Sequence, residues 1–283
     1  MIIWIASYPK SGNTWVRSFI SAIFNTNNGN FSFKDLKQIP QFPIRQQFQG
    51  ILNDFSDINI IKKNWITVQT KIGLESKFKF LKTHHVNCKI GEDAFTNFDN
   101  TLGVIYIVRD PRSVVTSLLN HYSLNNYLEA KTFLFEEKNW LGFKREKDKI
   151  EVTRFPTLIS SWSTNYNSWK HTSKNLILVK YEDLVKNPGE EFNKIVNYLE
   201  KLLNLQIDKT KIINAIKSTS FEELSRKEMS EGFYEGARNK AGIGNRKFFN
   251  LGPENKWEKL VDRNITDEIE QKFKNEMKEL GYI

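Results

Sequence analysis

The sequence predicts an α/β protein, a three-layer sandwich with a central parallel sheet flanked by helices. Apolar, β-branched runs alternate with helical patterns, as parallel sheets require. In two places a strand runs directly into a polar loop that opens a helix, so ligand sites are expected at the carboxyl ends of the strands. The strands are expected near 2–7, 78–83, 103–108 and 176–181. The helices are expected near 14–25, 111–122, 157–172, 189–203, 208–217 and 263–279.

The first strand–loop–helix unit carries the most informative motif. Residues 8–15 read Tyr-Pro-Lys-Ser-Gly-Asn-Thr-Trp and follow the apolar run 2–6. Such a unit directs backbone N–H groups and the positive end of a helix toward an anion. Lys10 adds a point charge, and Ser11 and Thr14 add hydroxyl groups. The segment predicts a phosphate-binding loop; the alternative is an ordinary strand-to-helix turn with a solvated lysine.

A second strand end predicts another anion site. The apolar run 104–108 leads directly into Arg109, Asp110 and Pro111. Asp110 is a good N-cap and Pro111 suits the first helical position, so a helix is expected to start here. Arg109, through its fork of donors, and Ser117 on the helix could bind one phosphate together. The alternative is an ion pair between Arg109 and Asp110 within the fold.

A third strand end offers a lysine and a histidine. Residues 80–84 read Phe-Leu-Lys-Thr-His. Histidine suits proton transfer, because its ordinary pKa of ~6.5 lies near neutral pH. The position relative to the two loops favours His84 among the four histidines of the chain. His85 is the next choice, because adjacent residues on a strand point to opposite faces.

These motifs together resemble the cytosolic-type sulfotransferases, which use 3′-phosphoadenosine 5′-phosphosulfate (PAPS) and have a P-loop-like nucleotide-binding topology. The loop is not a Walker A loop, because Lys10 precedes Gly12 instead of following the second glycine directly. It is similar to the family's 5′-phosphosulfate loop. The resemblance implies that the donor, and its product PAP, is bound by Lys10, Ser11, Gly12, Asn13, Thr14 and Trp15, with Trp15 stacked on adenine.

The resemblance also implies roles in catalysis and in donor recognition. His84 would act as the base that deprotonates the acceptor. Lys10 would stabilise charge on the bridging oxygen, and Lys82 charge on the sulfuryl oxygens. Arg109 and Ser117 are spaced as in the family's 3′-phosphate segment, which distinguishes PAPS from ATP. The implied reaction is in-line transfer of the sulfuryl group to an acceptor hydroxyl or amine, with no metal.

Weaker similarities follow in the same order as in the family. Tyr181, after the apolar run 176–179, resembles a tyrosine near adenine. A short Thr-Ser-Phe segment resembles one that contacts the nucleotide, and consists of Thr219, Ser220 and Phe221. Either similarity could instead reflect a plain strand end or a helix cap.

Residues 236–247 stand where the family has a basic, glycine-rich lid, commonly R-K-G-x-x-G-D-W-K. The departures here include Asn239 in place of arginine, whereas Lys240 is retained. We expect Arg238, Asn239 and Lys240 to contact the donor, with Arg238 or Arg246 supplying the missing arginine. The alternative is a basic loop without a ligand.

Composition limits the other classes of function. The 283 residues carry a net charge of +9, which suits a tetra-anionic donor but also nucleic acid or an acidic membrane. No nucleic-acid motif or clustered basic arm is seen, so no nucleic-acid partner is expected. With Cys88 as the only cysteine, neither an intramolecular disulfide nor an all-cysteine metal site can form. No linker interrupts residues 1–283, which are expected to form one sulfotransferase domain.

The apolar residues 1–6 are too few for a signal segment, and no stretch approaches the ~18 apolar residues that span a bilayer. The expectation is a cytoplasmic enzyme without stable membrane insertion. Its acceptor is a small molecule, lipid or glycan that the sequence does not specify, and an oligomer is possible. Residues 136–150 suggest a solvated helix or flap. The aromatic stretch 31–66 predicts either a satellite core or part of an acceptor pocket wall.

Two other classes of function compete with this interpretation. A P-loop kinase or NTPase would use Asp110 to hold Mg²⁺, although Lys10 is misplaced for it. A nucleotide-binding module without catalysis is favoured by the altered lid and disfavoured by the presence of Lys10, Lys82 and His84.

Overall fold

The computed structural model describes residues 1–55, 57–146, 149–170, 172, 175–236 and 246–283. The chain divides into two compact units, each built from three separate segments. The first unit consists of Met1–Tyr8, Gln38–Ile107 and Glu136–Val179. The second unit consists of Pro9–Lys37, Val108–Phe135 and Lys180–Ile283. Within the described residues, no helix is long and apolar enough to cross a bilayer.

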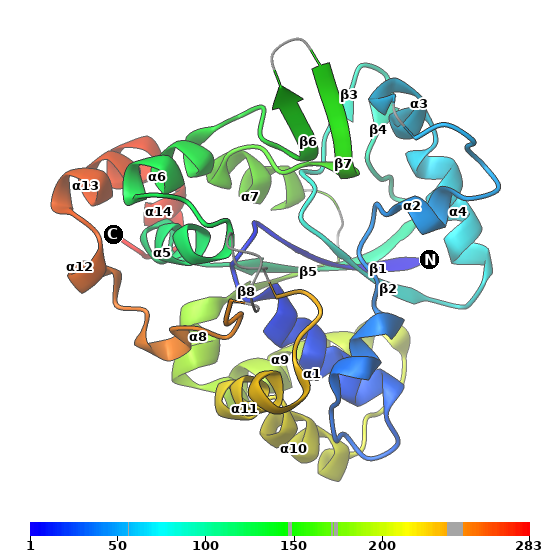
Figure 1. Cartoon of the computed structure of the whole chain (residues 1–283). Helices are drawn as coiled ribbons and strands as arrows, with labels where there is room; N and C mark the ends of the chain where they lie inside the picture. Colours follow the sequence, from blue (N-terminus) through cyan, green and yellow to red (C-terminus); the bar gives the residue numbers. More distant parts are fainter. Residues whose placement is uncertain (56, 147–148, 171, 173–174, 237–245) are drawn as a thin grey trace. The chain divides into compact units, whose positions relative to one another are not determined.

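The first unit contains a four-stranded sheet in the order β2-β1-β5-β8 (Figure 1). Strand β1 pairs in parallel with β2 and β5, for example with Trp4 opposite Leu81 and Val104. The strands are β1 (Ile2–Ser7), β2 (Lys79–Thr83), β5 (Thr101–Val108) and β8 (Leu176–Lys180). This parallel sheet confirms the predicted α/β class. The apolar residues along β1 and β5 are buried, as expected for strands covered on both faces.

The remaining elements of the first unit are short helices and two hairpins. The helices are α2 (Arg45–Phe48), α3 (Ile58–Lys63), α4 (Trp65–Leu74) and α7 (Trp162–Lys170). The hairpins pair β3 (Lys89–Ile90) with β4 (Asp93–Ala94), and β6 (Trp140–Glu146) with β7 (Lys149–Leu158).

The β6–β7 hairpin bears on two expectations. Its strands Trp140–Glu146 and Lys149–Leu158 contradict the helix alternative for the segment 136–150, while the flap alternative stays a prediction. The helix expected from 157 begins only at Trp162. Alternating residues such as Ile150 and Val152 favour an extended strand over a helix.

The aromatic stretch 31–66 contributes buried rings to the cores of both units. Phe42, Phe48 and Trp65 are fully buried in the first unit, where Phe42 contacts Trp4 with ring centroids 5.7 Å apart. Phe33 is buried in the second unit against Phe233. These contacts correspond to the satellite-core interpretation of the stretch.

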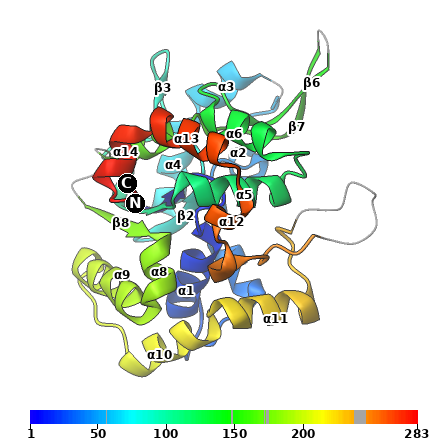
Figure 2. The same cartoon turned by 90° about the vertical axis from the view of Figure 1, so that its left-hand side faces the viewer.

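The second unit consists mainly of helices. Helices α5, α6 and α13 lie side by side, as do α8, α9 and α10 (Figure 1 and Figure 2). The longer helices are α1 (Asn13–Asn25), α5 (Pro111–His121), α6 (Tyr127–Phe135), α9 (Pro188–Leu203), α10 (Lys209–Ser218), α11 (Phe221–Glu231) and α13 (Arg263–Lys272). The shorter ones are α8 (Tyr181–Lys186), α12 (Trp257–Leu260), α14 (Lys274–Glu279) and the 3₁₀ turns η1 (Phe33–Gln38) and η2 (Gly252–Glu254).

The helix expected over 263–279 is interrupted at Phe273. This residue leaves helical geometry with φ −112° and ψ 24°, and so separates α13 from α14. Its ring is fully buried and packs edge-on against Phe135 at 5.2 Å. Burial of this ring accompanies the break that sequence periodicity alone did not predict.

Candidate active site

The loop between β1 and α1 has a backbone that suits anion binding. Gly12 has φ +100° and stands as the N-cap of α1, and its carbonyl accepts the N–H groups of Trp15 and Val16. A Cβ atom on Gly12 would lie 2.6 Å from Cδ2 of Tyr181, so this position has no room for a side chain. The first N–H groups of α1 therefore face the loop, where the partial positive charge of a helix start stabilises an anion.

Two buried polar atoms of the loop indicate the kind of ligand that fits. Ser11 Oγ and Trp15 Nε1 have no hydrogen-bond partner within the described residues. Leaving a buried donor unsatisfied costs ~1–3 kcal/mol, and a phosphate or sulfonate oxygen would remove that cost. The Trp15 ring packs edge-on against Tyr181 at 6.0 Å and Phe192 at 5.8 Å. Its predicted stacking on adenine stays a prediction.

Lys10 lies in the left-handed region with φ 66°, and its ammonium group is 3.8 Å from the centroid of the Phe248 ring. That geometry is a cation–π contact. The backbone at Phe248 is itself fixed, because the N–H groups of Phe248 and Phe249 donate to the Glu228 carboxylate at 2.6 and 2.9 Å. The residues after the predicted lid are thereby held on α11 and beside the phosphate-binding loop.

Arg109 and Ser117 are brought together as the sequence predicts. Arg109 Nη1 donates to Ser117 Oγ and to the carbonyl of Lys10, both at 3.1 Å. The guanidinium also lies 4.1 Å from the ring centroid of Tyr181. Lys10, Arg109, Ser117 and Tyr181 thus form one contiguous group in the second unit.

Asp110 is the N-cap of α5, as predicted, and its carboxylate pairs with Arg112. The Asp110 side chain accepts the N–H of Arg112 at 2.9 Å, and Arg112 Nη2 lies 2.6 Å from Asp110 Oδ2. A second carboxylate, that of Glu270, receives Arg112 Nη1. These bonds occupy the aspartate that a kinase-like site would use for Mg²⁺. Within the described residues, no group of three or more His, Cys, Asp or Glu residues is placed to hold a metal.

Asn255 lies beside the candidate site residue Ser117 and was not singled out from the sequence. Its amide donates to the carbonyl of Ser113 at 3.0 Å, and its Oδ1 accepts the hydroxyl of Thr116 at 2.6 Å. The amide also lies 3.5 Å from Ser117 Oγ. No motif marks this asparagine, which is 138 residues from Ser117 in the sequence.

Thr219, Ser220 and Phe221 have structural contacts that correspond to the helix-cap alternative. Thr219 is fully buried and donates its hydroxyl to Ala215 at the end of α10. Ser220 is the N-cap of α11 and accepts the N–H of Glu223. A contact of these residues with nucleotide stays a prediction.

The basic segment is described only in part. Arg238, Asn239 and Lys240 lie outside the described residues. Arg246 donates through Nη1 to the carbonyl of Asn120 at 2.9 Å, and Lys247 is exposed. Arg246 is therefore fixed on the last turn of α5.

In the first unit, Lys82 and His84 stand at the end of β2. The Lys82 side chain is buried, and its backbone pairs with Pro40 and Phe42. His84 is half-buried, and its Nδ1 lies 2.8 Å from the carbonyl of Ser7. The same Nδ1 lies 3.2 Å from Ser7 Oγ. Because a carbonyl can only accept, the Ser7 carbonyl favours the neutral tautomer with its proton on Nδ1, which leaves Nε2 to accept a proton.

His85 differs sharply from its neighbour. Its side chain is fully buried and stacks on Phe95 with centroids 4.1 Å apart and an interplanar angle of 2°. Nδ1 lies 2.6 Å from the carbonyl of Val86. Burial lowers the pKa of His85 to about 3, although the hydrogen bond to Val86 opposes this. His85 is therefore neutral at physiological pH.

Comparison with known proteins identifies the family. A family model described as a sulfotransferase domain matches residues 2–281, across both units. The chain belongs to the sulfotransferase family. It is 27% identical to sulfotransferase 1B1 of Canis lupus familiaris over 77% of this chain and 64% of that protein. It is 24% identical to luciferin sulfotransferase of Photinus pyralis, over 78% of this chain and 55% of that protein. The matched part thus spans less than two thirds of either relative.

Other relatives match over a larger part of their length. The flavonol 3-sulfotransferase of Flaveria bidentis is 23% identical over 99% of this chain and 83% of its own. Two solved structures share the fold at 16% identity. Retinol dehydratase in complex with androsterone and inactive cofactor PAP has a TM-score of 0.60, with 98% of this chain and 80% of that chain covered. Mouse sulfotransferase SULT7A1 complexed with PAP has a TM-score of 0.55, with 98% and 84% covered.

Proposed function

We propose that this protein is a PAPS-dependent sulfotransferase, and that both units together form one sulfotransferase domain. The observation that carries the proposal is the group formed by Arg109, Ser117 and the loop carbonyl of Lys10. It places the guanidinium of Arg109 beside a helix start that carries the buried, unsatisfied hydroxyl of Ser11. Family membership over residues 2–281 supports the same function.

The donor would bind to the second unit through its two anionic ends. The loop 10–14, with the ammonium of Lys10, suits the 5′-phosphosulfate. Arg109 and Ser117 suit the 3′-phosphate, because a guanidinium and a hydroxyl supply donors to a dianion. For Lys10 to reach a phosphosulfate oxygen, its cation–π contact with Phe248 must loosen, a contact worth ~0.5–1 kcal/mol at an exposed site. One charge-assisted hydrogen bond to the donor would offset that cost.

In the proposed reaction the acceptor oxygen attacks sulfur, and the bond from sulfur to the bridging oxygen breaks. The acceptor proton goes to Nε2 of His84, and PAP leaves with the electron pair on its 5′-phosphate. Lys10 would stabilise the charge on that leaving oxygen, and Lys82 the charge on the sulfuryl oxygens. Positioning and electrostatics carry most of the rate enhancement in such a transfer.

The choice of His84 as base is supported by its hydrogen bonding. The Ser7 carbonyl favours the tautomer in which Nε2 accepts a proton. His85 is fully buried, and its lowered pKa disfavours the protonated form that a base must adopt during turnover. The two neighbours therefore have different roles in this proposal.

The acceptor that we propose is a small molecule with a hydroxyl group. Relatives are named for a flavonol and for luciferin, which are small acceptors. The hydrogen bonds of Asp110 with Arg112 disfavour the kinase alternative, since they occupy the carboxylate that would hold Mg²⁺.

A mass-spectrometric screen tests the function. The protein is incubated with PAPS and pooled small-molecule, lipid and glycan acceptors, and products are searched for the mass of an added SO₃. The expected result is a sulfated small molecule that forms without added Mg²⁺. Lys10→Met serves as the inactive control, and Lys209→Met, an exposed lysine on α10, as the matched active one. Turnover of ATP that needs Mg²⁺, or tight binding of PAP with no product from any pool, would contradict the proposal.

A further inference from the structure

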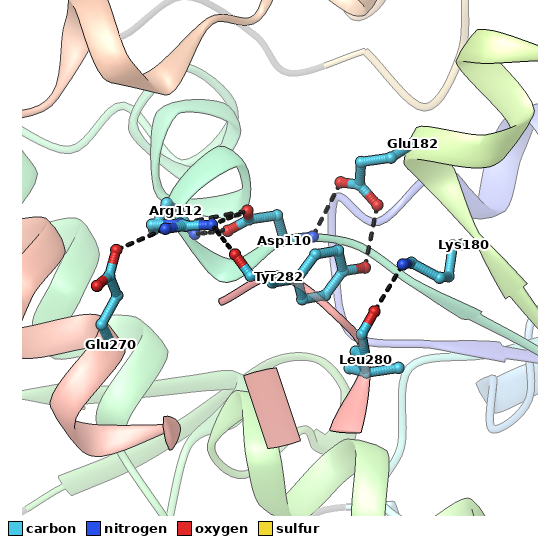
Figure 3. A network of polar contacts seen from close by, with 7 residues as sticks. All are labelled: Asp110, Arg112, Lys180, Glu182, Glu270, Leu280 and Tyr282. Carbon is cyan, nitrogen blue, oxygen red and sulfur yellow. Dashed lines mark hydrogen bonds and ion pairs between the residues drawn. The ribbon is translucent and has the colours of Figure 1, made fainter. Parts of the chain in front are cut away.

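Residues Leu280–Tyr282, which follow α14, bind two segments of the second unit at once. Figure 3 shows Tyr282 between Arg112 and Glu182. The Tyr282 carbonyl accepts Arg112 Nη2 at 2.9 Å, and the Tyr282 hydroxyl donates to Glu182 Oε2 at 3.0 Å. Lys180 Nζ donates to the carbonyl of Leu280 at 2.6 Å. One short segment is thus connected to the start of α5 and to the start of α8.

Glu182 is the residue at which these connections meet. Its Oε1 accepts the backbone N–H of Asp110 at 3.0 Å, while its Oε2 accepts the Tyr282 hydroxyl. Burial raises the pKa of Glu182, whereas the Asp110 N–H and the charge of Arg109 lower it. The pKa of Tyr282 is well above its ordinary value because of burial and the Glu182 carboxylate, so its hydroxyl stays a donor.

The two residues that this hydrogen bond joins, Asp110 and Glu182, are next in sequence to residues of the proposed donor site. Asp110 follows Arg109 directly, and Tyr181 precedes Glu182. The Arg109 guanidinium lies 4.1 Å from the Tyr181 ring, and Glu182 joins the residues that follow these two, since it is itself the residue after Tyr181 and accepts the N–H of Asp110. A displacement of the Glu182 carboxylate would move the backbone of Arg109 or the ring beside its guanidinium. The Glu182 carboxylate in turn loses one of its donors if the Tyr282 hydroxyl is removed.

We propose that Tyr282 is a positioning residue for the nucleotide site. Through its hydroxyl it fixes Glu182, which sets the position of Arg109 against Ser117 and Tyr181, and thereby the preference for a 3′-phosphate. The inference rests on the proposed function, since it requires that Arg109 binds that phosphate. Tyr282 itself touches neither donor nor acceptor in this role. Its effect is therefore expected in the selectivity between nucleotides, more than in the affinity for adenosine monophosphate.

The test is calorimetric binding of PAP and AMP to the full chain. Tyr282→Phe removes one hydroxyl and leaves the carbonyl contact with Arg112. Because the hydroxyl acts on Arg109 only through Glu182, the loss should be smaller than that of a direct bond to a charged group: we expect a roughly five- to tenfold loss of PAP affinity, with AMP affinity changed less than twofold. Tyr198→Phe on α9 is the matched control, and its PAP-to-AMP ratio should equal that of the wild type. In an Arg109→Ala background, Tyr282→Phe should no longer change PAP affinity.

The outcomes separate this inference from the proposed function. Equal binding of PAP and AMP by the wild type contradicts the 3′-phosphate site itself. A wild-type preference for PAP that Tyr282→Phe leaves intact overturns only the inference. Equal losses for both nucleotides, together with a lowered Tm, indicate a purely structural tyrosine and overturn it as well. A PAP-selective loss that disappears in the Arg109→Ala background supports it.

Discussion

The ends of strands β2 and β5 each carry two residues of one type with opposite surroundings. After β2, His84 contacts the carbonyl of Ser7, whereas His85 is fully buried against Phe95. After β5, Arg109 donates to a carbonyl and a hydroxyl, whereas Arg112 binds two carboxylates. Arg112 is bound by carboxylates within the fold, whereas Arg109 Nη1 reaches the Lys10 carbonyl and the Ser117 hydroxyl at the proposed phosphate site. The partners, more than the residue type, distinguish a candidate site residue from a structural one.

The largest expected effect concerns the two histidines, of which His84 is the proposed base and His85 a buried structural residue. His84→Ala should lower turnover of an alcohol acceptor by ~10²–10⁴-fold, because the general base is lost, with PAP affinity nearly unchanged. The measurement is single-turnover formation of sulfated product. His85→Ala is the comparison variant, and its main expected effect is a lower free energy of unfolding from the buried cavity. A dead His85→Ala enzyme beside an active His84→Ala enzyme would show that the roles are reversed.

Lys10 should act mainly on the chemical step. Its charge is most valuable when the bridging oxygen becomes negative, so Lys10→Met should lower kcat by roughly a hundredfold, by analogy with the loss of an oxyanion donor. Rapid-quench rates at saturating PAPS measure this directly. Lys209→Met controls for the loss of one positive charge. If Lys10→Met lowered only the affinity for PAPS and left the rapid-quench rate unchanged, Lys10 would be a binding residue.

The two arginines should divide between binding and stability. Arg109→Ala should remove most of a preference for PAP over AMP of at least about tenfold, since charge-assisted bonds of ~1.5–3 kcal/mol are lost. Arg112→Ala should keep most of that preference. It should instead lower the free energy of unfolding by ~3–5 kcal/mol, because it leaves the buried Asp110 carboxylate without its partner. Calorimetry and urea unfolding measure the two quantities, and a loss of PAP preference in both variants would remove the distinction.

His85 should make stability depend on pH. Its folded pKa of about 3 is below the ordinary 6.5, so between these values the unfolded chain binds a proton that the folded chain does not. The free energy of unfolding should therefore fall as the pH falls, by ~1.4 kcal/mol per pH unit well below pH 6.5. Urea unfolding between pH 4.5 and 7.5 measures the slope. The slope should be smaller in His85→Phe, and equal slopes would mean that His85 does not carry this dependence.

The parts of the site that the sequence predicted depend on local signals. Gly12 at a strand-to-helix turn, Asp110 as an N-cap and Ser117 two turns into α5 follow from short-range chemistry. Asn255 and Tyr282 could not be found in this way, because their contacts join segments 100 or more residues apart. The β6–β7 hairpin was missed because the charged composition of residues 136–150 was interpreted as a solvated helix or flap.

The hydrogen bond from Arg109 to the carbonyl of Lys10 has a thermodynamic consequence. Through this bond the ordering of the Arg109 guanidinium is coupled to the ordering of the loop, although the two follow different strands. A ligand that orders Arg109 then also orders the loop, and linkage requires that a ligand of the loop raises affinity at Arg109 by the same factor. Inorganic sulfate and a nucleotide with only a 3′-phosphate should therefore bind cooperatively. The two anionic ends of a donor would contribute more together than the sum of the separate fragments.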